Sequence, residues 1–152
     1  MNFSELTAKY DVPAPRYTSY PTVSFWEVAP SREQWLKSIQ ETLNQDIDQG
    51  WSLYLHIPFC ESLCTFCGCN TSITRNHEVE LPYIQHVLTE WQNYQNSIPE
   101  LKKSPLRVLH LGGGTPTFLS PKNLRSLLEP ILESTLRKEA FEGSVEVDPR
   151  RT

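Results

Sequence analysis

The sequence lacks the features that mark several large classes of protein. No apolar stretch approaches the roughly 18 residues that a membrane-spanning helix needs, and the first residues do not have the pattern of a secretory signal peptide. Positive charge is not in excess either: 14 lysine and arginine residues stand against 18 aspartate and glutamate residues, for a formal net charge of −4. We therefore expect a protein of the cytoplasm that binds neither a membrane nor, through bulk basic charge, a nucleic acid.

Cysteine is absent from all but one short segment. All cysteines lie between Cys60 and Cys69, in the pattern CxxxCxxCxC, so they cannot cross-link distant segments as the disulfides of a secreted protein do. Structural zinc sites usually combine two short cysteine pairs from separate segments, whereas one irregular loop can wrap around an iron–sulfur cluster. The spacing favours a cluster, with a zinc site or a Cys64/Cys67 redox pair as alternatives.

The chain is long enough for one domain with a moderate core, and its first 30 residues differ from the rest. Prolines interrupt any helix there, so residues 1–30 are expected to form an extended arm that carries several aromatic side chains. The prolines concerned are Pro13, Pro15, Pro21 and Pro30. Residues 31–152 are expected to form the body of the protein.

Hydrophobic periodicity in residues 31–152 predicts helices and strands in alternation. Helices are expected over residues 31–49, 82–96 and from 121 onward, and strands over residues 51–57, 106–111 and 143–148. This order suits parallel strands joined by crossover helices, which is an α/β fold. Three strands cannot close a barrel, so we expect the last strand to be an exposed edge and the chain to be part of a larger architecture.

Two further features lie where active sites gather, at the carboxyl ends of parallel strands. The triplet Gly112–Gly114 follows the second strand, and its missing side chains let backbone groups approach a ligand closely, although an ordinary strand-to-helix turn would also use it. Glu146 is predicted within the third strand, on the face opposite its valine neighbours. A carboxylate there needs a partner unless it faces solvent at the edge.

The segment from Tyr54 to Cys69 resembles the signature of radical S-adenosylmethionine enzymes, in the pattern Tyr54-x-His56-Ile57-Pro58-Phe59-Cys60-x-x-x-Cys64-x-Phe66-Cys67-x-Cys69. Cys69 and the stretch Pro15–Thr22 make it similar, within that superfamily, to the oxygen-independent coproporphyrinogen III oxidase family. The stretches Gly112–Thr117 and Val145–Arg150 agree. The resemblance implies that residues 31–152 form the first βα units of an incomplete radical-SAM (β/α) barrel, the N-terminal portion of a longer enzyme.

The resemblance implies an oxidoreductase with two kinds of cofactor. Family members convert coproporphyrinogen III to protoporphyrinogen IX in haem biosynthesis, by oxidative decarboxylation of two propionates. They use a [4Fe–4S] cluster and S-adenosyl-L-methionine, with two molecules of the latter in a full-length enzyme. Because family members continue well past this length, we expect the chain to be inactive alone or to need a complementing chain that supplies the rest of the barrel.

The resemblance also assigns roles to particular residues. The cluster ligands are Cys60, Cys64 and Cys67, which leave one iron open for S-adenosylmethionine. The residues expected to bind or line the cofactor site are Tyr54, Phe66, Gly113, Gly114, Thr115 and Glu146. His56 and Cys69 are the candidate catalytic residues, and Cys69 is not expected to be a ligand.

Two other functions remain open from the sequence. One is a non-catalytic iron–sulfur or haem-handling protein of the same superfamily. The other is an interaction module built around zinc, for which the same cysteines would supply the ligands.

Overall fold

The computed structural model describes residues 2–11, 25–26, 28–65 and 67–149. Contacts between residues divide the chain into two units, Met1–Arg32 and Glu33–Thr152. Within the described residues, no helix is long and apolar enough to cross a membrane.

Helix α1 (Phe3–Tyr10) shows that the expectation of an extended arm over residues 1–30 is wrong for its first part. The Asn2 side chain accepts a hydrogen bond from the backbone N–H of Glu5 at 2.9 Å, and the Glu5 carboxylate accepts one from the Asn2 N–H at 2.9 Å. This reciprocal capping box begins a helix before the first proline is reached. The motif stretch Pro15–Thr22 lies outside the described residues.

The second unit alternates helices and strands as predicted. Its main elements are α2 (Arg32–Gln45), β1 (Trp51–Ile57), α3 (Glu80–Ser97), β4 (Leu106–Gly113), α4 (Pro121–Glu133) and β5 (Arg137–Val145). Between them lie the short strands β2 (Phe59–Cys60) and β3 (Ser72–Ile73) and three short 3₁₀ turns, His77–Val79, Pro99–Lys102 and Pro116–Phe118. Strands β2 and β3 pair in parallel, which the sequence analysis did not predict.

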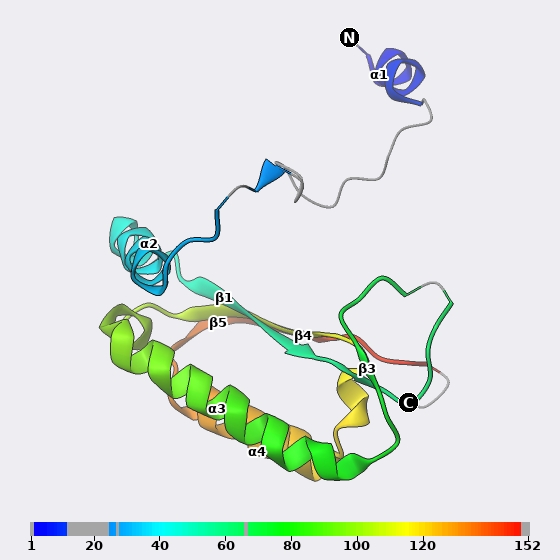
Figure 1. Ribbon diagram of the computed structural model, residues 1–152. Helices are drawn as coiled ribbons and strands as arrows, with labels where there is room; N and C mark the ends of the chain where they lie inside the picture. The colour runs from blue at the N-terminus through cyan, green and yellow to red at the C-terminus, as the bar shows by residue number, and fades with distance from the viewer. Residues whose placement is uncertain (1, 12–24, 27, 66, 150–152) are drawn as a thin grey trace. The chain divides into compact units, whose positions relative to one another are not determined.

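The main sheet is open and wholly parallel, so the predicted α/β class is confirmed. Strand β4 is central, and β1 and β5 pair with it on either side (Figure 1). β5 is an edge strand, as expected, and all its residues except Phe141 are exposed. Because the strands are parallel, the chain leaves β1, β4 and β5 at the same end of the sheet.

The boundaries of the last strand differ from the prediction of residues 143–148. β5 begins at Arg137 and ends at Val145, so Glu146 follows the strand instead of lying within it. The early residues of β5 show little apolar alternation, and they become a strand because they pair with β4, beginning with Arg137 opposite Leu106. Helix α2 likewise ends at Gln45 and not near residue 49.

The two faces of the sheet have opposite character. Helices α3 and α4 lie side by side along one face (Figure 1). The core between them and the sheet contains Leu55, Ile57, Leu109, Leu111, Ile84, Trp91, Leu127 and Ile131. Alternation along β1 turns Tyr54 and His56 to the other face, where Tyr54 shares one cross-strand row with His110 and Ser144.

A buried carboxylate joins the beginnings of α3 and α4. Glu80 is only 2% exposed. Its Oε2 accepts hydrogen bonds from the backbone N–H of Ser120 at 3.0 Å and from Asn123 Nδ2 at 2.6 Å, while its Oε1 lies 2.6 Å from His77 Nδ1. Burial alone would raise the pKa of Glu80, but these hydrogen bonds outweigh it and hold the pKa below the ordinary value.

The lowered pKa of Glu80 predicts a pH-dependent contribution to stability. A group whose pKa is lower in the folded state stabilises the fold above its ordinary value of 4.5 and loses that contribution as the pH falls through the folded-state pKa. We expect Glu80→Gln to lower the free energy of unfolding by about 1–3 kcal/mol at pH 7. The difference from wild type should shrink below pH 4.5. Urea titrations across this range measure it, and a difference independent of pH would contradict the prediction.

Candidate functional site

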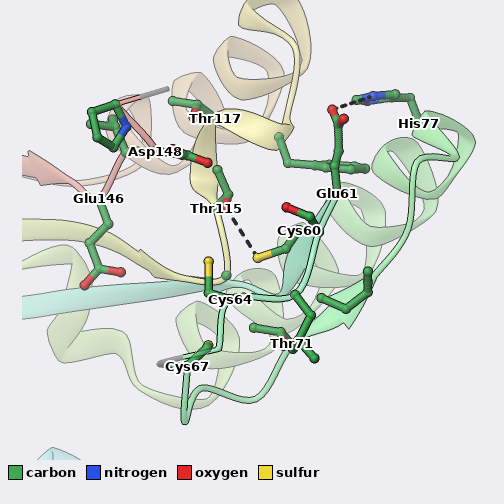
Figure 2. Close-up of a pocket in the computed structure, with 17 residues that line it drawn as sticks. Cys60, Glu61, Cys64, Cys67, Thr71, His77, Thr115, Thr117, Glu146 and Asp148 are labelled. Carbon is green, nitrogen blue, oxygen red and sulfur yellow. Dashed lines mark hydrogen bonds and ion pairs between the residues drawn. The ribbon is translucent and has the colours of Figure 1, made fainter. Parts of the chain in front are cut away.

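A cavity of about 570 Å³ lies at the carboxyl ends of the parallel strands (Figure 2). Its walls come from the loop after β1, the glycine loop after β4 and the segment after β5. Six of the residues predicted for the site line this cavity: Cys60, Cys64, Cys67, Gly114, Thr115 and Glu146. The parallel sheet therefore gathers segments that are far apart in the sequence.

The cysteine loop is anchored at both ends by pairing between β2 and β3. The backbone N–H of Ser72 donates to the Pro58 carbonyl at 2.7 Å, and that of Thr74 donates to the Cys60 carbonyl at 2.8 Å. Cys60 is half-buried at the base of the loop, and its Sγ lies 3.4 Å from Thr115 Oγ1 across the cavity (Figure 2). Its thiol is thus held in place by the opposite wall.

The remaining cysteines are exposed, and none of the cysteines forms a disulfide. The backbone N–H of Cys67 donates to the Cys64 carbonyl at 3.1 Å, which forms a tight turn. Cys69 does not line the cavity. Its backbone N–H lies 3.4 Å from Cys67 Sγ, and the hydrogen bond and charge of Cys67 raise the pKa of the Cys69 thiol.

The donor set of this cavity fits an iron–sulfur cluster. Three cysteines of one loop line one cavity, and thiolates are the ligands that iron–sulfur clusters use. In the part of the chain that the structure describes, no three histidine, cysteine or acidic side chains are close enough together to hold a single metal ion. A cluster does not require that closeness, because each thiolate binds a different iron atom.

The glycine loop passes directly over the end of β1. The backbone N–H of Gly114 donates to the Ile57 carbonyl and that of Thr115 to the Phe59 carbonyl, both at 2.8 Å. A Cβ atom on Gly114 would lie 2.8–2.9 Å from backbone atoms of Pro58 and Phe59. Only glycine fits this approach, which places Thr115 beside Cys60.

Gly113 has a different requirement. Its φ angle is +110°, in the region that favours glycine, and a Cβ atom would lie 2.8 Å from the His56 ring. Its backbone N–H donates to Glu146 Oε2 at 3.1 Å. Contacts within the protein therefore already require glycine at positions 113 and 114, whether or not a ligand binds there.

A polar network extends from the glycine loop across the face of the sheet opposite α3 and α4. His110 stacks on Tyr54 with ring centroids 5.6 Å apart, and its Nδ1 lies 2.7 Å from Ser144 Oγ. Its Nε2 lies 3.4 Å from Glu146 Oε1. No pattern in the sequence marks His110 and Ser144 as site residues; they join the network because they share a register with Tyr54 in the folded sheet.

Tyr54 and His56 do not line the cysteine cavity; they line a second cavity, of about 790 Å³, along β1. The Tyr54 hydroxyl is 3.0 Å from His56 Nδ1, and His56 Nε2 is 2.8 Å from the Asn70 carbonyl. Nε2 therefore donates and Nδ1 accepts. Burial, followed by the charges of Glu146 and Cys69, raises the pKa of Tyr54. Phe66, the other predicted aromatic residue of the site, lies outside the described residues.

The buried hydroxyl of Tyr83 supports β1 from the helical side. It donates a hydrogen bond to the His56 carbonyl, and burial raises the pKa of Tyr83 to about 12. The backbone of β1 at His56 is thus held by α3, while the His56 side chain is held by Asn70 on the cysteine loop.

Comparison with solved structures identifies the class. No protein-family model matches the chain. The structure of coproporphyrinogen III oxidase from Escherichia coli, described as a radical SAM enzyme, matches it with a TM-score of 0.78 and 31% identity, and the match covers 99% of this chain and 32% of that one. The fold is therefore that of the N-terminal portion of a radical SAM enzyme, with an open sheet in place of a closed barrel.

Curated relatives narrow the class to a particular group. The oxygen-independent coproporphyrinogen III oxidase of Pseudomonas aeruginosa is 35% identical over 150 residues, which cover 97% of this chain and 32% of the relative. That of Escherichia coli K12 is 34% identical over 145 residues, 95% of this chain and 30% of the relative. The predicted resemblance is confirmed: the chain is similar to oxygen-independent coproporphyrinogen III oxidases along nearly its whole length. It spans about a third of theirs.

The packing of the glycine loop predicts unequal effects of two alanine substitutions. Gly114→Ala places Cβ against backbone that cannot move freely, so we expect the free energy of unfolding to fall by about 1–3 kcal/mol. Gly143→Ala is the matched control, because the nearest atom to its Cβ would be a Phe141 ring carbon at 3.9 Å. Urea denaturation of both variants measures the difference, and equal midpoints would contradict this view of the loop.

Proposed function

We propose that the chain is the cofactor-binding portion of an oxygen-independent coproporphyrinogen III oxidase, in which the cysteine loop holds a [4Fe–4S] cluster and the glycine loop binds S-adenosylmethionine. The observation that carries the proposal is the placement of Cys60, Cys64 and Cys67 around one cavity with Gly114 and Thr115. The similarity to relatives of that name supports it.

The residues of the cavity suit the two cofactors. When bound at the three cysteines, the cluster supplies an electron to the sulfonium of S-adenosylmethionine. Gly113 and Gly114 would offer backbone carbonyls to the amino group of the methionine part, and Thr115 would offer its hydroxyl to the carboxylate. The backbone N–H groups of these three residues already donate within the protein. Glu146, held by the Gly113 N–H and beside His110, offers carboxylate oxygens to the ribose hydroxyls.

Four further residues predicted from the sequence complete the proposed site. Tyr54 and Phe66 would line the cofactor. His56 and Cys69 would act in catalysis, His56 with its ring oriented by the Tyr54 hydroxyl and the Asn70 carbonyl. Both ring nitrogens of His56 have partners, so its orientation is set before any ligand arrives.

The relatives' names support coproporphyrinogen III as the substrate, and the reaction is the one that the resemblance implies. We assign this chain to the oxidative decarboxylation of coproporphyrinogen III to protoporphyrinogen IX, together with a complementing chain that supplies the other two thirds of the relatives' length. We place it in the cytoplasm, because exposed cysteine thiols and an oxygen-sensitive cluster require a reducing compartment.

Cluster binding is tested by anaerobic reconstitution with iron and sulfide, followed by electron paramagnetic resonance of the reduced protein. We expect a [4Fe–4S] signal that shifts when S-adenosylmethionine is added, because one iron is left open. Cys60→Ser, Cys64→Ser and Cys67→Ser should each lose the signal, whereas Cys69→Ser should keep it. One zinc per chain and no cluster would favour an interaction module, and a cluster that ignores S-adenosylmethionine would favour a non-catalytic protein.

The role of Glu146 is tested by calorimetric titration of the reconstituted protein with S-adenosylmethionine. Glu146→Gln removes a charged acceptor, so we expect the dissociation constant to rise about 10-fold, or 1.4 kcal/mol. Glu142→Gln, at an exposed position on β5, the strand that precedes Glu146, is the matched control and should bind like wild type. Equal affinity of all three proteins would remove Glu146 from the binding site.

A further inference from the structure

The buried carboxylate of Glu80 reaches the cysteine cavity through His77. Because Glu80 Oε1 is an acceptor, His77 Nδ1 is the donor in their 2.6 Å contact. The other ring nitrogen, Nε2, lies 3.7 Å from Glu61 Oε1, as Figure 2 shows. Glu61 directly follows Cys60, so His77 connects the cysteine loop to the buried start of α3.

The same ring also contacts the opposite wall of the cavity. His77 stacks on Phe118, with ring centroids 4.4 Å apart and an interplanar angle of 15°. Phe118 belongs to the 3₁₀ turn that follows Thr115, whose hydroxyl is 3.4 Å from Cys60 Sγ. That turn leads to Ser120, whose N–H donates to Glu80. The cysteine loop and the segment that follows Thr115, the two walls that meet at Cys60, are therefore both linked to the Glu80 carboxylate.

Packing alone does not explain this arrangement. Burying an ionised carboxylate is unfavourable, and apolar side chains of similar volume would hold two helices together at least as well. A hydrogen-bonded charge instead fixes the orientation of the side chains that bind to it. Glu80 faces Ser120 and Asn123 with one oxygen and His77 with the other, so the His77 ring has a defined direction.

We propose that His77, oriented by Glu80, is a positioning residue for the iron–sulfur cluster. By contacting Glu61 on one wall and Phe118 on the other, it sets the spacing of the cavity at Cys60 and so controls how firmly the cluster is held. This inference rests on the proposed function, because it takes the cysteines to be cluster ligands. Residues that orient a metal-binding loop commonly change metal affinity about 10- to 100-fold when they are replaced.

Two substitutions separate the contacts of His77. His77→Phe keeps a ring against Phe118 and loses both nitrogen contacts. His77→Asn keeps a donor for Glu80 and is too short to reach Glu61. The matched control is His86→Phe, on the helix α3 that follows His77, because His86 Nδ1 contacts the carbonyl of Pro82 at 2.6 Å in its own helix.

The full chain and each variant are reconstituted anaerobically, and loss of the cluster to an iron chelator is followed by visible absorbance. We expect loss to be about 10-fold faster in both His77 variants and unchanged in His86→Phe. The paramagnetic resonance spectrum of the reduced cluster should shift in the His77 variants only. Thermal unfolding of the cluster-free proteins measures stability separately.

The outcomes distinguish the inference from simpler explanations. A purely structural role for His77 predicts that His77→Asn, which keeps the Glu80 contact, has a wild-type cluster lifetime and spectrum, and that result overturns the inference. If the phenylalanine variant does not fold, His77→Asn decides alone. Failure of the wild-type chain to take up a cluster overturns the proposed function and the inference together, whereas equal lifetimes in wild type and His77→Asn overturn only the inference.

Discussion

Parallel pairing around β4 is the constraint on which the rest of the structure depends. Because β1 and β5 both run parallel to β4, their following segments leave at the same end of the sheet. Cysteine thiols, glycine backbone and the Glu146 carboxylate therefore come to one place, although the chain between them is long. The crossover helices that parallel pairing requires lie on one face and supply the core, which leaves the other face for polar groups.

Much of the fold could be predicted because, in most elements, the local sequence favours the same secondary structure as the tertiary contacts do. The alternation of residues 51–57 gave the bounds of β1, and Ser120 with Pro121 marked the start of α4, where the Ser120 hydroxyl caps the helix. The prediction failed for two elements whose formation is not marked by the overall pattern of the local sequence. Arg137–Val145 is a strand only because β4 is beside it, and α1 depends on a capping box placed before the prolines that suggested an extended arm.

The residues of the candidate site also include some that the sequence suggests and some that it does not. The spacing of the cysteines predicted that they would gather on one loop, and Cys60, Cys64 and Cys67 line one cavity. His110 was not predictable, since its place beside Tyr54 follows from strand register, which neither residue's neighbours reveal. Glu80 was also missed, because its partner Ser120 is 40 residues away and nothing local marks a glutamate as buried.

The contacts that Glu146 makes within the protein affect the free energy with which a ligand can bind beside it. Its carboxylate already accepts a hydrogen bond from the Gly113 amide and lies beside the His110 ring. Any ligand that approaches this carboxylate with donors of its own enters an exchange reaction, in which new hydrogen bonds replace or share existing ones. Affinity here reports the difference between two sets of partners, so selectivity depends on how well a ligand reproduces the contacts that the protein makes with itself.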